Sequence, residues 1–141
     1  MFVLIVGAGR VGAAVAQSML AQGHDVSVLD EDPLSHERLD AGLASSWEEA
    51  GGRFTVGQGI ELEALREAGI EDADVFIAST SGDNTNIVIA QVAQRKFQVR
   101  TVIARVMDPA RATWFAEQGV RTICPTLEAI GMFESAIGEV A

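Results

Sequence analysis

The sequence predicts an α/β protein with a doubly wound parallel sheet of six strands and helices on both faces. Short apolar segments alternate with longer amphipathic segments along the whole chain. This alternation is typical of strand–helix–strand units with right-handed crossovers. Most of the apolar segments are unbroken runs rather than apolar–polar alternations, as expected of strands that are buried on both faces of a parallel sheet.

The alternation predicts the positions of the individual elements. The expected strands are Phe2–Val6, Val26–Leu29, Phe54–Val56, Val75–Ala78, Thr101–Ala104 and Arg121–Cys124. The expected helices cover residues 10–22, 34–44, 60–68, 83–96, 109–118 and 127–140. We therefore expect residues 1–126 to form one domain and residues 127–141 to form a C-terminal helix that follows it.

Two of the expected helices carry more apolar surface than one face of a sheet requires. Residues 87–93 are apolar nearly all round, and a helix of this kind is normally covered on both sides. The last helix has an apolar stripe at helical spacing, formed by Leu127, Ile130, Phe133, Ile137 and Val140. Packing on the chain's own core and a contact between subunits would both explain these surfaces.

Composition excludes several classes of protein. The 141 residues are 48% hydrophobic and 21% charged, as expected of one globular domain. Ten Lys and Arg residues against twenty Asp and Glu residues leave a net charge of -10, so a basic face for nucleic acid is not expected. No apolar run reaches the roughly 18 residues of a membrane-spanning helix. One cysteine and two histidines favour a reducing, cytoplasmic setting without a zinc cluster.

Residues 7–12, Gly-Ala-Gly-Arg-Val-Gly, form a G-x-G-x-x-G motif between the first strand and the first helix. In this motif the first glycine permits a tight turn, the second admits a phosphate, and the third lets the helix and strand pack closely. The helix N-terminus directs amides and a positive dipole at the anion. Arg10 lies inside the loop, where its guanidinium can contact a phosphate. The motif predicts a Rossmann-like nucleotide site, and an ordinary strand–helix turn is the alternative.

Asp30 ends the second expected strand, eighteen positions after Gly12. A carboxylate in this position can accept hydrogen bonds from both ribose hydroxyls of an adenosine. A 2′-phosphate there would be repelled by the negative charges of Asp30, Glu31 and Asp32. The expected ligand is therefore NAD(H) or an adenine nucleotide (ATP, ADP or AMP), and not NADP. A helix cap or a solvated loop is the alternative role of Asp30.

The carboxyl ends of the other strands are expected to line the same crevice. Hydroxyl groups follow the fourth strand, Arg105 ends the fifth, and a glycine-rich turn follows the third. The alternatives are helix capping into Asp83 for the hydroxyls and a surface pair with Asp108 for Arg105. The residues expected to contact the nucleotide are Gly7, Gly9, Arg10, Val11, Gly12, Asp30, Glu31, Asp32, Gly57, Gln58, Ser79, Thr80, Ser81 and Arg105.

The sequence sets up no general acid, general base or nucleophile, so we expect a protein that is not an enzyme. There is no tyrosine, which excludes the Tyr-x-x-x-Lys pair of short-chain dehydrogenases. We expect His24 to be a turn residue and His36 to be a solvated surface residue. Cys124 ends a buried strand and is expected to be a small core residue.

Several motifs together resemble the TrkA N-terminal domain family, the module that regulates the conductance of potassium channels. They are Gly7-x-Gly-Arg-x-Gly12, Asp30 with Asp32, Gly57, Ala73-Asp74-Val-Phe-Ile-Ala, Asp83-x-x-Asn86, Arg105-Val-Met-Asp108-Pro109, Gly119 and Pro125. Two positions depart from the family pattern, because Gln58 stands where an aspartate is usual and Thr126 stands where some members carry an acid.

The resemblance implies a cytosolic nucleotide-binding subunit that assembles as dimers or a larger ring. Its partner would be a membrane potassium transporter or channel subunit, and it would sit at the inner face of the membrane through that partner. It also implies that Arg10 and Arg105 approach the phosphates, that Asp30 and Asp32 approach the ribose and base, and that the last helix crosses to a neighbouring subunit. An isolated NAD-binding domain of a dehydrogenase, or an assembly module without a working nucleotide site, are the alternative functions.

Overall fold

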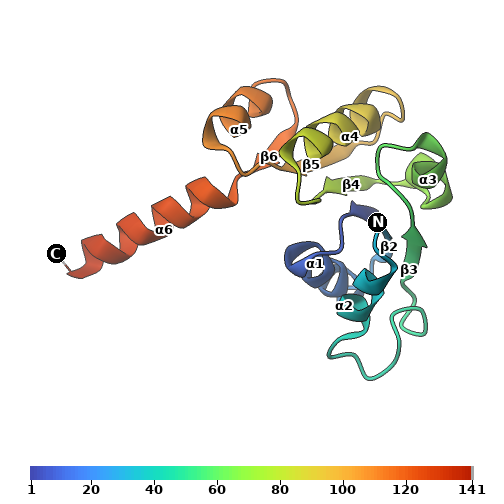
Figure 1. Ribbon diagram of the computed structural model, residues 1–141. Helices are drawn as coiled ribbons and strands as arrows, with labels where there is room; N and C mark the ends of the chain where they lie inside the picture. Colours follow the sequence, from blue (N-terminus) through green and yellow to red (C-terminus); the bar gives the residue numbers. More distant parts are fainter. Residues whose placement is uncertain (141) are drawn as a thin grey trace.

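A single six-stranded parallel sheet, in the order β3-β2-β1-β4-β5-β6, forms the centre of the protein in the computed structural model (Figure 1), which describes residues 1–140. The strands are β1 (Phe2–Val6), β2 (Asp25–Asp30), β3 (Arg53–Val56), β4 (Val75–Ala78), β5 (Thr101–Arg105) and β6 (Arg121–Ile123). The helices are α1 (Arg10–Ala21), α2 (His36–Asp40), α3 (Leu62–Glu67), α4 (Asp83–Arg95), α5 (Pro109–Ala116) and α6 (Pro125–Val140). The order reverses between β1 and β4, so the predicted doubly wound α/β fold is confirmed.

The expected elements are all present, with differences at their ends. The expected helix over residues 34–44 is shorter: a 3-10 turn at Pro33–Ser35 leads into α2, and the chain then turns at Gly42, whose φ is +77°. The last helix begins at Pro125 rather than at residue 127. Proline is accepted in the first turn of a helix because its missing N–H would have no intrahelical partner there.

The alternation of side chains along β1 divides the core into two layers. Val3 and Ile5 pack with Ala13 and Ala16 of α1 on one face. Leu4 and Val6 pack on the opposite face, within a larger cluster that includes residues of α3, α4 and α5. Because both faces of β1 are covered, the strand is an unbroken apolar run.

Trp47 packs in the core on the α1 and α2 side of the sheet. Its side chain is fully buried, and its indole N–H donates to the carbonyl of Arg53 at 2.9 Å. Its backbone N–H donates to Oδ1 of Asp40 at 2.8 Å. A Cβ on Gly52 would lie 2.1 Å from the indole ring, so the connection from α2 to β3 folds closely over this tryptophan.

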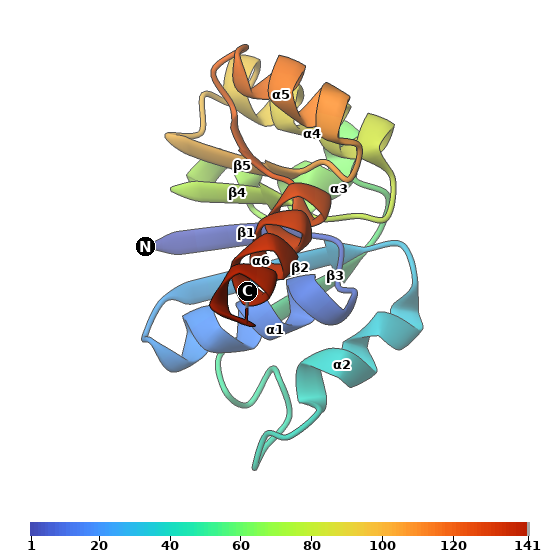
Figure 2. The same ribbon diagram turned by 90° about the vertical axis from the view of Figure 1, so that its left-hand side faces the viewer.

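The sheet face on the α1 and α2 side is less covered over β4, β5 and β6. Val75, Ile77 and Ile103 are only partly buried, and Ile123 is exposed. The helix α6 projects away from the rest of the molecule (Figure 1) and points toward the viewer in Figure 2, and none of residues 125–140 in this helix is buried. By contrast, α4 buries Asn86, Ile89, Ala90 and Ala93, so much of its apolar surface belongs to the core. No helix among residues 1–140 has both the length and the apolarity to cross a membrane.

We expect Gly12→Ala to lower the free energy of unfolding by at least about 2 kcal/mol, because an added Cβ would lie 1.9 Å from the carbonyl oxygen of Gly7. Urea denaturation measures this change. Gly131→Ala is the control, since a Cβ there would meet nothing within 4 Å beyond its chain neighbours and the nearby backbone of its own helix. It is expected to be neutral or to stabilise by up to about 1 kcal/mol through helix propensity. Equal stability of the two variants would contradict the prediction.

Candidate functional site

A cleft of about 420 Å³ opens at the carboxyl ends of the central strands. It lies where the strand order reverses between β1 and β4, which is the position where open α/β sheets bind ligands. Its volume falls in the usual range of small-molecule sites, roughly 300–1,000 Å³. The turn after β1, the ends of β2 and β5, and the loops after β3 and β4 line it.

The glycine turn is built by close contacts between backbones. Gly7 has φ +103°, and its N–H donates to the carbonyl of Leu29 at 2.9 Å. A Cβ there would lie 2.6 Å from the backbone of Ser79. The Ser79 hydroxyl lies 3.2 Å from the carbonyl oxygen of Val6 and 3.0 Å from that of Gly7, and can donate to either. Gly7 and Gly12 are therefore required by the packing of the fold.

Gly9 differs from the other two glycines of the motif. Its φ is -73°, which any residue adopts, and apart from its two chain neighbours no described residue has an atom within 4 Å of a Cβ built on it. Packing therefore does not require glycine at this position. Since Gly9 lines the cleft, the open space beside its Cα is available for a ligand.

The N-terminus of α1 begins at this turn without a side-chain cap. Gly9 is its N-cap, and the first turn contains no acidic residue. The first N–H groups of a helix have no intrahelical partner and carry the positive end of the helix dipole. The start of α1 is therefore suited to bind an anion such as a phosphate.

Asp30 joins the end of β2 to the glycine turn. Its Oδ2 accepts a hydrogen bond from the N–H of Ala8 at 2.6 Å, and its Oδ1 accepts one from the N–H of Asp32 at 2.8 Å. Each carboxylate oxygen has a further lone pair, so Asp30 can also accept from a ligand. The helix-capping role belongs to Asp32, whose Oδ1 accepts from the N–H of Leu34 at 2.9 Å.

Arg105 reaches from the end of β5 to the loop after β4. Its Nη2 donates to the carbonyls of Thr80 at 2.6 Å and Ser79 at 3.3 Å. Its Nε is buried and has no hydrogen-bond partner among residues 1–140. The surface pair with Asp108 that the sequence allowed is not formed in this part of the chain. Arg105 thus brings a positive charge to the lining of the cleft.

Asn86 holds the loop after β4 beside Arg105. Its amide nitrogen donates to the carbonyls of Thr80 at 3.0 Å and Arg105 at 2.9 Å. Its Oδ1 accepts from the hydroxyl of Thr80 at 2.7 Å. The hydroxyls of Ser79 and Thr80 therefore do not cap α4, whose N-cap residue is Gly82.

Most of the residues expected to contact a nucleotide come together at the cleft. The cleft is lined by Gly7, Gly9, Asp30, Glu31, Asp32, Gly57, Gln58, Ser79, Thr80, Ser81 and Arg105. The other three lie outside its lining: Arg10 and Val11 are exposed at the start of α1, and Gly12 is buried beneath the turn. Their contacts with a ligand stay predictions, as do those of the lining residues.

Arg38 lines the cleft although the sequence analysis did not select it. Its Nη1 lies 3.3 Å from the carbonyl oxygen of Ala8 and 3.4 Å from the hydroxyl of Ser35. Ser35, three residues earlier, also lines the cleft. Residues three apart on a helix share a face, so this spacing after the end of β2 is the sequence pattern that could have identified Arg38. Arg38 adds a second positive charge, close to the acidic end of the cleft.

Asp83 fixes the backbone that follows Arg105. Its carboxylate accepts hydrogen bonds from the N–H groups of Met107 at 2.7 Å and Asp108 at 3.0 Å. Burial alone would raise the pKa of Asp83, but these amides and the charges of Arg111 and Arg105 hold the pKa below its usual value. The loop after β5 is therefore tied to the N-terminus of α4 by a carboxylate that stays ionised.

Comparison with known proteins identifies the family. A model of the TrkA-N domain matches residues 3–125. The chain belongs to the TrkA-N domain family. One relative, the Trk system potassium uptake protein TrkA of Streptomyces coelicolor, is 46% identical over 123 residues, which are 87% of this chain and 52% of the relative. This TrkA-N chain therefore spans about half the length of the curated relative that it matches.

Solved structures share the TrkA-N fold. The AMP-bound form of the Shewanella denitrificans Kef CTD has a TM-score of 0.78 at 22% identity, over 100% of this chain and 82% of that chain. The GsuK channel bound to NAD has a TM-score of 0.68 at 18% identity, over 88% of this chain and 21% of that chain. At these identities the likeness concerns the fold alone.

We expect Asp83→Asn to lower the free energy of unfolding by about 1–3 kcal/mol at pH 7, because charged hydrogen bonds to two amides are lost. The folded-state pKa is lowered, so the stabilisation is present above the unfolded-state pKa and disappears as the pH falls through the folded-state pKa. Urea denaturation from pH 7 to pH 3 should show the wild type and the variant converging in acid. Asp25→Asn, at an exposed carboxylate, is the control. A difference independent of pH would contradict the prediction.

Proposed function

We propose that this TrkA-N domain binds an adenosine-containing nucleotide in the cleft and is the nucleotide-binding regulatory part of a membrane potassium transport system. The observation that carries the proposal is the distribution of charge in one cleft. Asp30 at the end of β2 and Arg105 at the end of β5 line the cleft from opposite sides of β1, and the uncapped N-terminus of α1 borders the turn between them. The transport role is supported by the name of the 46% identical relative.

The charge distribution favours one orientation of the nucleotide in the cleft. The ribose would donate to Asp30, with the base beside the loop of Gly57 and Gln58. The phosphates would lie at the start of α1 and reach Arg105. The AMP and NAD named for the two solved structures share this adenosine monophosphate unit, which supports either class of ligand.

We propose that NADP is disfavoured. A 2′-phosphate beside Asp30 would face three carboxylates, those of Asp30, Glu31 and Asp32, with Arg38 as the one cation among the lining residues at that end of the cleft. The chain as a whole has a net charge of -10 and repels anions at long range. Attraction for phosphate must then come from Arg105, Arg10 and the amides of the glycine turn.

We propose regulation by conformational change rather than catalysis. A phosphate bound by Arg105 would compete with the carbonyls of Ser79 and Thr80 for its guanidinium. Two residues later, the carbonyl of Met107 accepts a hydrogen bond from the hydroxyl of Thr126 at 2.7 Å, in the first turn of α6. A shift of the loop after β5 would therefore move the start of α6.

We propose that α6 packs on a second copy of the chain. Its stripe of Leu127, Ile130, Phe133, Ile137 and Val140 is exposed, and so is part of the sheet face over β4, β5 and β6. Two apolar surfaces on one chain that do not meet each other can meet between two copies. The assembled regulator would then contact a potassium transporter or channel subunit at the cytoplasmic face of the membrane.

We expect Arg105→Gln to weaken AMP and NAD binding by about 10- to 100-fold, since charged hydrogen bonds to phosphate contribute about 1.5–3 kcal/mol. Adenosine lacks the phosphate, so its affinity should stay unchanged. Isothermal titration calorimetry measures all three ligands. Arg121→Gln removes the same charge at an exposed position on β6 and should bind like the wild type. If the wild type binds none of these ligands at about 1 mM, the nucleotide proposal is wrong.

Phe133→Glu is expected to convert the oligomer to monomers, because it places a charge on the apolar stripe of α6. Sedimentation velocity measures the change, and circular dichroism shows whether the domain stays folded. Ser135→Glu adds the same charge about 200° further round the helix, outside the stripe, and should leave assembly intact. Identical sedimentation of Phe133→Glu and the wild type would show that α6 does not join the subunits.

A further inference from the structure

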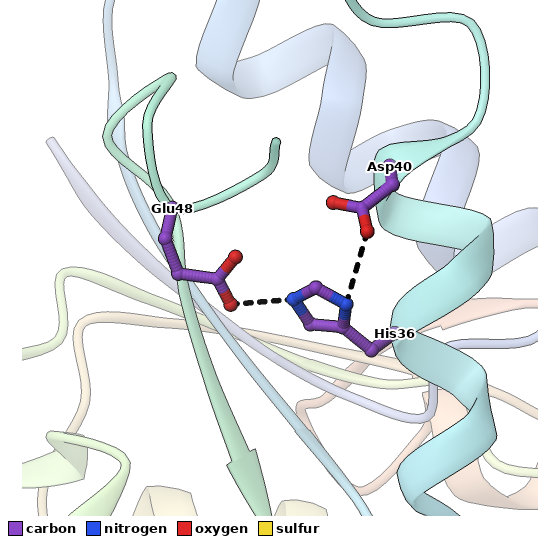
Figure 3. A group of neighbouring side chains, drawn as sticks. All are labelled: His36, Asp40 and Glu48. Carbon is purple, nitrogen blue, oxygen red and sulfur yellow. Dashed lines mark hydrogen bonds and ion pairs between the residues drawn. The ribbon is translucent and has the colours of Figure 1, made fainter. Parts of the chain in front are cut away.

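His36, Asp40 and Glu48 form a cluster on the α2 side of the molecule (Figure 3). Nδ1 of His36 lies 3.2 Å from Oδ2 of Asp40, one turn later on α2. Nε2 lies 2.5 Å from Oε1 of Glu48, which belongs to the connection between α2 and β3. His36 was expected to be a solvated surface residue, but both of its ring nitrogens contact carboxylates and its ring packs edge-on against Phe54 at 5.3 Å.

Asp40 is itself held in place by the backbone. Its Oδ1 accepts the N–H of the buried Trp47 at 2.8 Å, which leaves Oδ2 facing the imidazole. Because an ionised carboxylate oxygen can only accept, Oδ2 can take a hydrogen bond from Nδ1 of His36 when that nitrogen carries a proton. The second ring nitrogen, Nε2, is then directed at Glu48.

Nε2 of His36 faces a carboxylate oxygen of Glu48 across 2.5 Å. A ring nitrogen that carries a proton can donate it to this carboxylate, and a ring nitrogen without a proton offers a lone pair to a metal ion that the carboxylate also binds. Histidines that bind a metal commonly donate their other N–H to a carboxylate, which orients the ring and raises its basicity. The Asp40–His36 pair has this arrangement.

We propose that Nε2 of His36 and the carboxylate of Glu48 bind a divalent transition-metal ion, with zinc as the best-suited ion, and that Asp40 positions the ring. Imidazole nitrogen with carboxylate oxygen is a donor set that suits zinc. Two ligands at about 2.0–2.2 Å in tetrahedral geometry are about 3.3 Å apart. Glu48 must therefore move outward by less than 1 Å, and its side chain, 51% exposed, is free to do so. Water would complete the coordination.

The site is separate from the nucleotide cleft. None of the three residues is among those that line the cleft, although Ser35 and Arg38 of the same turn are. The proposal therefore does not depend on nucleotide binding. A metal at this site would join α2 to the connection that covers Trp47.

Zinc titration by isothermal calorimetry on the full chain tests the proposal. We expect saturable binding of one zinc ion per chain, with a change in the ring-nitrogen NMR signals of His36. Asp40→Asn should weaken the affinity about 10- to 100-fold, the usual effect of removing a residue that orients a ligand. His36→Gln should remove the binding. Glu48→Gln should weaken it at least about tenfold, although a glutamine can still accept a hydrogen bond from the ring.

His24→Gln is the matched control, because His24 is the other histidine of the chain and its Nδ1 lies 3.3 Å from the N-terminal amine. We expect this variant to bind zinc like the wild type. Circular dichroism of each variant separates loss of the site from loss of the fold. Absence of saturable zinc binding at about 1 mM would overturn the proposal. Zinc binding that is lost with His24 and kept with His36→Gln would also overturn it.

Discussion

The close approach of the glycine turn to the ends of β2 and β4 is the contact on which the rest of the structure depends. Gly7 has no room for a side chain against Ser79, and its N–H bonds the end of β2. Ser79 and Asp30 then hold the turn from either side. Because this arrangement fixes where α1 starts, the same backbone contacts that join the central strands also aim the helix N-terminus into the cleft.

Positively charged side chains gather at the cleft although the protein as a whole is strongly negative. The chain carries a net charge of -10, yet Arg38 and Arg105 line one cleft with the amides of the glycine turn nearby. Arg105 uses part of its guanidinium to hold the loop after β4, so it is positioned before any ligand arrives. A preorganised donor binds an anion with less loss of side-chain entropy than a free surface arginine.

The outer half of the sheet and the last helix leave apolar surface uncovered within the chain. Ile77 and Ile103 are only partly buried, and no residue of α6 is buried. The start of α6 is nonetheless bonded to the loop that follows Arg105, through Thr126 and Met107. The cleft and the exposed helix are therefore connected through the backbone of residues 105–107 and the hydrogen bond between Thr126 and Met107.

The sequence alone determined the strands, the doubly wound topology and the acidic end of the cleft. Burial on both faces leaves an unbroken apolar run, and Asp30 follows its glycine motif at a characteristic spacing, so both are local patterns. Only the tertiary structure decided that Arg38 lines the cleft, that Arg10 lies outside its lining, and that His36 meets Glu48. Those contacts join segments across turns and crossovers, where distance depends on how the chain packs over Trp47 and the sheet rather than on spacing in the sequence.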